Sequence, residues 1–225
     1  INGTGPAASS GATSGAITVN IPDASAVGAT HTIPVTLPAG ATLTGVSVNF
    51  NMTHTFDGDM QINVKAPNGQ VLNLVNQRGG GGDNFVNTTI AAGGASLATG
   101  VAPFTGTFAP DAALNVGPTG FASTATSFNQ LLSVGNGDWT IAMRDLFALD
   151  LGILTSWTLT FNYTLDPTGL WTGPANTIFT NPASTIPYVT GSQANVVWVK
   201  PTAVGANAYV ATLASGPCAG GEGDA

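Results

Sequence analysis

Apolar and polar residues alternate along four segments of the chain. Every second residue is apolar in residues 46–53, and residues 60–66, 139–144 and 157–163 repeat this pattern. A period of two is typical of a strand with one face on a core and the other in water. The four runs therefore predict an antiparallel β-sandwich, and we expect their apolar positions to line one shared interior.

Turn signals separate these runs. Pro67-Asn68-Gly69 predicts a tight turn, so residues 60–75 should form a β-hairpin. Four glycines and an aspartate at residues 79–83 predict a loop, and residues 91–135 are rich in loop signals. Weaker strand patterns lie at residues 16–21, 30–37, 195–200 and 208–213.

The same signals predict a division of the chain. Residues 1–14 are rich in Gly, Ala and Ser and indicate a linker or lead-in, and residues 15–165 form the sandwich. Asp166-Pro-Thr-Gly169 indicates a boundary. We expect residues 166–218 to form an Ig-like β unit. This unit would be short, because it has about 50 residues whereas an immunoglobulin domain has roughly 100. Residues 219–225 are expected to form a C-terminal tail.

Composition narrows the class of protein. Charged residues make up 7% of the chain and hydrophobic residues 43%, which favours a packed core over a disordered acidic segment. With four Lys and Arg in all, helix formers are scarce and the fold class is all-β. The net charge of −7 excludes nucleic acid as a partner, because phosphate contacts need clustered cations.

Two further features bear on location. No apolar run reaches the length of about 18 residues that suggests a membrane span, and the single cysteine, Cys218, excludes an internal disulfide. The low content of charged residues favours an extracellular or cell-surface protein.

Five carboxylates form the candidate metal site. They stand on three predicted loops that should meet at one end of the sandwich: Asp57, Asp59, Asp83, Asp145 and Asp150. Carboxylates on flexible loops, with carbonyls from residues 80–84, are the ligands that Ca²⁺ prefers. The alternative, that each aspartate caps its own turn, stays open. Zinc is disfavoured because softer ligands are scarce.

No set of residues predicts catalysis. His54 lies near two of these aspartates, but no nucleophile or second base accompanies it, so packing or hydrogen bonding at a strand end is the simpler interpretation. Trp139 and Trp157 fall on apolar-face positions and should be core. Trp171 and Trp198 would pack between domains or stack on sugar, so carbohydrate is a candidate partner.

Residues 16–164 resemble the P domain, the module that follows the catalytic domain in kexin-like serine proteases. Six stretches match that family's patterns in order: Asn51–Met60 (NMTHTFDGDM), Ala66–Gly69 (APNG), Asn76–Phe85 (NQRGGGGDNF), Phe104–Pro110 (FTGTFAP), Gly135–Ile141 (GNGDWTI) and Arg144–Trp157 (RDLFALDLGILTSW). The resemblance implies a jelly-roll-like sandwich and a structural Ca²⁺. Residues 1–14 cannot hold a catalytic triad, so it implies no protease activity for this chain.

Residues 167–218 resemble, more loosely, short Ig-like or PKD-like repeats of large secreted bacteroidete surface proteins. The two resemblances suggest a non-catalytic structural or adhesive module, stabilised by calcium, whose partners are neighbouring domains or copies of itself in a filament. One alternative is the accessory domain of a secreted subtilisin-like protease or metalloprotease. Another is a carbohydrate-binding module.

Overall fold

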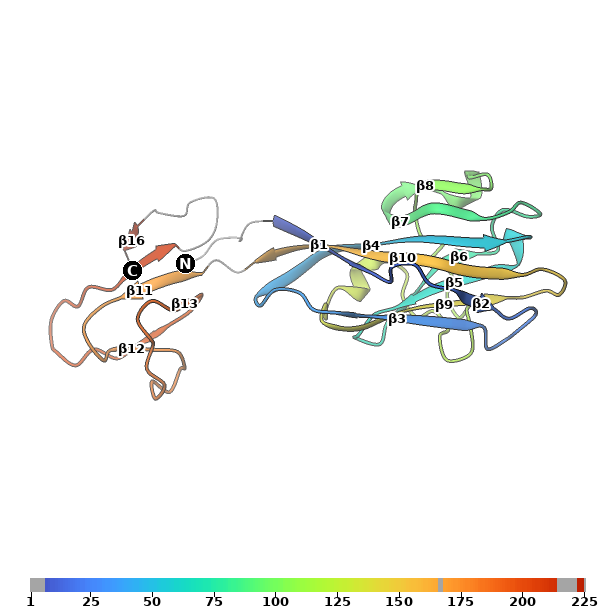
Figure 1. The fold of residues 1–225 in the computed structure, drawn as a ribbon. Coiled ribbons are helices and arrows are strands. Elements are labelled where there is room, and N and C mark those ends of the chain that lie inside the picture. Colours follow the sequence, from blue (N-terminus) through green and yellow to red (C-terminus); the bar gives the residue numbers. More distant parts are fainter. Residues whose placement is uncertain (1–6, 166–167, 214–221, 225) are drawn as a thin grey trace. The chain divides into compact units, whose positions relative to one another are not determined.

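The computed structural model describes residues 7–165, 168–213 and 222–224. It is nearly all β and divides into two compact units (Figure 1). The larger, here the sandwich unit, comprises residues 9–38 and 43–163. The smaller, here the C-terminal unit, is formed mainly by the described residues from Thr164 onward.

Two sheets build the sandwich unit. In the first sheet the strand order is β1-β10-β4-β7-β8, and β2 also pairs with β10. In the second it is β3-β9-β5-β6. The strands are β1 (Ala7–Thr13), β2 (Val19–Ile21), β3 (Ala29–Val35), β4 (Ala41–His54), β5 (Met60–Lys65), β6 (Val71–Asn76), β7 (Phe85–Ala95), β8 (Phe104–Phe108), β9 (Gly137–Asp145) and β10 (Gly152–Leu165).

The pairing is mostly antiparallel, as the alternation predicts. β9 lies between β3 and β5 and is antiparallel to both, and β5 and β6 form the predicted hairpin. β8 runs parallel to β7, which is an exception that the sequence pattern did not indicate. The prediction of an all-β antiparallel sandwich is confirmed.

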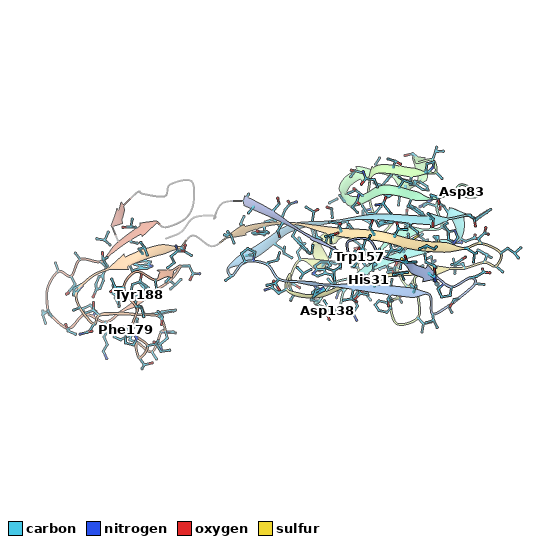
Figure 2. All side chains as sticks on the ribbon, viewed as in Figure 1. His31, Asp83, Asp138, Trp157, Phe179 and Tyr188 are labelled. Carbon is cyan, nitrogen blue, oxygen red and sulfur yellow. The ribbon has the colours of Figure 1, made fainter. Side chains whose placement is uncertain are left out.

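The interior lies between the two sheets, where the alternating runs place their apolar residues. Phe50, Trp139, Trp157 and Phe161 are all at most 1% exposed. The rings of Trp139 on β9 and Phe161 on β10 lie 5.3 Å apart and join the two sheets. Trp157 Nε1 donates to His31 Nδ1 on β3 (2.9 Å), so a second contact crosses the core (Figure 2). Trp139 and Trp157 are therefore core residues, as expected.

The predicted linker is wrong over its second half. Ala7–Thr13 form β1, which lies beside β10 at the edge of the first sheet. Trp157 N–H donates to Ser14 Oγ, and Ser14 N–H donates to the Trp157 carbonyl (both 2.9 Å). Small residues can form this strand because an edge position needs backbone pairing rather than bulky apolar side chains. The first six residues of the predicted linker lie outside the described part of the chain.

The predicted wet face of the hairpin is also wrong. Gln61 and Asn63 occupy its polar positions but are only 4% and 0% exposed. The loop after β8 covers them: Asn63 Nδ2 donates to the carbonyls of Val116 and Phe121 (both 2.7 Å), and Gly117 N–H donates to Gln61 Oε1 (3.1 Å). The polar residues of β5 therefore satisfy the backbone of a loop.

The C-terminal unit has short strands. Its sheets have the orders β13-β11-β15-β16 and β12-β14. The strands are β11 (Gly169–Thr172), β12 (Ile178–Phe179), β13 (Gln193–Ala194), β14 (Trp198–Val199), β15 (Val210–Leu213) and β16 (Glu222–Asp224). The strand expected over residues 195–200 is thus reduced to two residues. The Ig-like resemblance of this unit stays a prediction.

Helical structure is confined to three 3₁₀ turns in the described residues: η1 (Asp57–Asp59), η2 (Leu97–Thr99) and η3 (Phe128–Leu131). No helix in that part of the chain is long and apolar enough to cross a bilayer.

Candidate functional site

The turn η1 connects β4 to β5 and holds two of the five candidate carboxylates. Asp57 N–H donates to the Gly82 carbonyl and Gly58 N–H to the Gly80 carbonyl (both 2.8 Å). A Cβ on Gly58 would lie 2.9 Å from Gly80 Cα, so the two backbones approach more closely than a side chain would allow. Residues 79–83, here called the glycine loop, therefore fold over η1 and bury it.

Asp57 is fully buried in this arrangement. Its Oδ1 accepts the Asn84 N–H (3.0 Å), whereas its Oδ2 is buried with no hydrogen-bond partner in the structure. Burial raises the pKa of Asp57 to about 7; the bond from Asn84 opposes the rise and the charge of Asp83 adds to it. The Oδ2 atom of Asp57 is therefore a hydrogen-bond acceptor without a donor in the structure.

A buried pair lies beside this turn. His54, at the end of β4, places Nε2 3.2 Å from Oδ2 of Asp145 at the end of β9, and both residues are 1% exposed. The other nitrogen, Nδ1, is within hydrogen-bond distance of the backbone of Phe56. Asp145 Oδ1 accepts the Phe147 N–H (3.1 Å). Both ring nitrogens of His54 are therefore engaged by groups within the sandwich unit.

The three remaining aspartates have different surroundings. Asp59 is 7% exposed, and its pKa is raised by burial first and then by the charges of Asp145 and Asp150, against a lowering from His54. Asp150 Oδ1 accepts the Thr55 hydroxyl (2.8 Å). Asp83 is exposed on the glycine loop, at one end of the sandwich unit (Figure 2).

The charges of these carboxylates act on one another. The charge of Asp83 raises the pKa of Asp57, and the charges of Asp145 and Asp150 raise the pKa of Asp59. Across the described residues, no three His, Cys, Asp or Glu side chains are placed to hold a metal ion. Asp145 caps its own turn through the bond from the Phe147 N–H, whereas Asp150 accepts a hydroxyl from Thr55, which is distant in the sequence. The partnerless oxygen of Asp57 is the feature that suits a cation, and calcium binding stays a prediction.

An exposed apolar loop lies next to these carboxylates and was missed from the sequence. Between β9 and β10, Phe147 is 56% exposed, Leu149 93% and Leu151 72%. We call these three side chains the apolar tip. Large apolar groups gathered on a surface commonly mark an interaction site. The alternation of residues 147–151 was the available signal, but it falls between two stronger strand patterns.

The backbone of the apolar tip is held by neighbouring polar groups. Leu149 N–H donates to Asp23 Oδ2 (3.2 Å) and Leu151 N–H to Thr55 Oγ1 (3.4 Å). Leu149 has a φ of 96°, a left-handed value that is unusual for a bulky residue. Such a conformation persists only where surrounding contacts fix it, and it is found most often at functional positions.

The family comparison concerns the part of the chain that contains η1 and the glycine loop. Residues 43–101 match the family model of the Proprotein convertase P-domain. This supports the P-domain resemblance of the sandwich unit. The Ig-like resemblance of the C-terminal unit stays a prediction.

Individual relatives are larger proteins. The chain is 29% identical over 143 residues to Leupeptin-inactivating enzyme 1 of Streptomyces exfoliatus, covering 64% of this chain and 24% of that protein. Among solved structures, the serine protease of Aeromonas sobria gives a TM-score of 0.43 at 14% identity, over 70% of this chain and 27% of that one. Its complex with a chaperone gives 0.45 at 14% identity, over 73% and 28%. The chain spans about a quarter of the length of these proteins.

Proposed function

We propose that this chain is the non-catalytic accessory part of a larger extracellular peptidase. The observation that carries the proposal is the P-domain match over residues 43–101, together with a relative, named as an enzyme, of which the chain covers only 24%. A segment of that size in an enzyme fits an accessory module.

The site supports an accessory role over a catalytic one. His54 and Asp145 form hydrogen bonds with each other and with backbone groups. A catalytic base, by contrast, must direct its proton-accepting atom at a substrate. The sandwich interior, by contrast, is closed by large buried aromatic side chains, which suits a rigid supporting module.

The apolar tip is the surface through which such a module would contact the rest of its parent protein. Its three side chains project from a loop whose backbone is fixed by Asp23, Thr55 and Asp145. A preorganised surface loses little conformational entropy on contact, so its burial converts efficiently into binding free energy. Burial of three such side chains would contribute several kcal/mol, at about 1.5–3 kcal/mol each.

Substitution of the apolar tip in the full-length gene product tests this role. We expect Phe147→Ser, Leu149→Ser and Leu151→Ser together to shorten the half-life of peptidase activity at elevated temperature severalfold. The same substitutions should change the stability of the isolated chain little, because the side chains are already exposed.

A matched control lies elsewhere on the sandwich unit. Leu114 and Val134 are 49% and 43% exposed and lie outside the apolar tip, so Leu114→Ser with Val134→Ser should leave the half-life unchanged. An unaltered half-life in the tip variant, or an equal loss in the control, would remove the docking role.

The structural or adhesive role predicted from the sequence, with self-assembly into a filament, remains a prediction. The match to a P-domain and the size of the relatives favour the peptidase-accessory role over it.

A further inference from the structure

The C-terminal unit contains a cavity that the accessory role does not use. Its volume is about 340 Å³, within the range of small-molecule sites. β11, the turn after it, the start of β12 and residues 187–190 supply the lining, which includes Trp171, Pro174, Asn176, Ile178, Pro187 and Tyr188. No charged side chain is among the lining residues. A ligand suited to this cavity is therefore small and neutral.

The polar ends of the two aromatic side chains are already used inside the unit. Trp171 Nε1 donates to the Ala194 carbonyl (2.9 Å), and Trp171 N–H donates to the Tyr188 hydroxyl (3.1 Å). The same hydroxyl donates to the Ser192 carbonyl. These bonds fix the rings in place, so what the rings offer a ligand is apolar surface rather than hydrogen bonds. Tyr188 is shown within the C-terminal unit in Figure 2.

Three other lining residues supply free hydrogen-bonding groups. The side chains of Thr172, Asn176 and Thr190 line the cavity, and none has a hydrogen-bond partner within the described residues. Asn176 has a φ of 61°, a left-handed value that asparagine tolerates, and it sits in a turn closed by the bond from Thr177 Oγ1 to the Pro174 carbonyl (2.7 Å). The Asn176 amide is thus presented from an ordered turn.

We propose that this cavity binds a neutral sugar ring. A pyranose has an apolar face of C–H groups that stacks on aromatic rings, and a rim of hydroxyls that pair with an amide and with threonine hydroxyls. The cavity offers both kinds of surface and no charge. A proline-rich peptide also binds aromatic-lined grooves. It is disfavoured here because a pocket of about 340 Å³ suits one or two rings rather than an extended chain, and because the indole N–H of Trp171 already donates to the Ala194 carbonyl.

A glycan-binding measurement on the whole chain tests the proposal. The probes are neutral oligosaccharides of glucose, galactose, mannose and N-acetylglucosamine, with sialylated and sulfated oligosaccharides and a polyproline peptide alongside. We expect binding to be confined to neutral sugars. Asn176→Gly should weaken it about tenfold, since glycine keeps the left-handed turn but removes the amide.

The matched control is Trp198→Phe. Trp198 is half-buried in the same unit but is not a lining residue, so this change should leave affinity unaltered. Equal melting temperatures of the variants would show that the unit stays folded. The proposal is overturned if no neutral sugar binds at low millimolar concentration, if only charged sugars or the peptide bind, or if Asn176→Gly binds as tightly as the unsubstituted chain.

Discussion

At the residue scale, Asp57 has the least favourable surroundings among the carboxylates. It is fully buried, one of its oxygens has no hydrogen-bond partner in the structure, and the charge of Asp83 acts on it. An unpaired buried charge is costly, so the protonated form is favoured and the pKa rises to about 7. The residue therefore destabilises the folded protein whenever it is ionised.

This cost has a defined dependence on pH. In the unfolded chain the pKa of Asp57 is 3.8, below its folded value, so the folded state binds more protons between these two values. Stability should fall as the pH rises from about 4 through about 7 and then level off. We expect Asp57→Asn to remove much of this fall, since asparagine imitates the protonated acid and can still accept the Asn84 N–H.

Thermal melting in the presence of chelator at pH 5 and pH 8 measures the effect. At pH 8, Asp57→Asn should increase the free energy of unfolding by up to a few kcal/mol, because each unit of pKa difference corresponds to about 1.4 kcal/mol. Asp138→Asn, at an exposed aspartate, is the control and should show no such gain. A variant that is less stable than the unsubstituted chain at pH 8 would contradict the assignment.

At the element scale, the alternating runs predicted which strands form the interior, because burial between two sheets selects one apolar residue in every two. Phe50, Trp139 and Phe161 lie where the pattern places them. The pattern could not predict that Asn63 is buried, since its cover is a loop from a distant part of the chain. Nor could it predict β1, whose small residues are held by backbone bonds rather than by apolar burial.

The candidate site was predictable only in part for a similar reason. The sequence placed Asp57 and Asp59 at a turn between two strands, which the structure confirms as η1. It could not specify which carboxylate oxygens receive donors, because those donors come from residues far away, such as Asn84 for Asp57 and Thr55 for Asp150. The apolar tip likewise depends on exposure, which the sequence does not fix.

The loops around η1 should respond together to the removal of calcium. A cation at Asp57 would supply the partner that its Oδ2 lacks, and we expect Ca²⁺ to raise the melting temperature by several degrees relative to chelator. The effect should be larger at pH 8 than at pH 5, since the ligand must be ionised, and it should be lost in Asp57→Asn. Equal melting temperatures with Ca²⁺ and with chelator would exclude a calcium site.

At the scale of the whole molecule, the chain combines a rigid sandwich unit with a smaller unit of short strands. It covers 24% of the length of Leupeptin-inactivating enzyme 1, and both ring nitrogens of the buried His54 are engaged within the sandwich unit. These features fit a module that supports chemistry performed elsewhere in a longer protein.

The decisive measurement of the accessory role is peptide hydrolysis by the isolated chain and by the full-length gene product. We expect residues 1–225 alone to hydrolyse a panel of unstructured peptides no faster than buffer, with or without Ca²⁺, and the full-length product to hydrolyse them readily. Hydrolysis by the isolated chain that is lost in His54→Ala, or a full-length product without any peptidase activity, would contradict it.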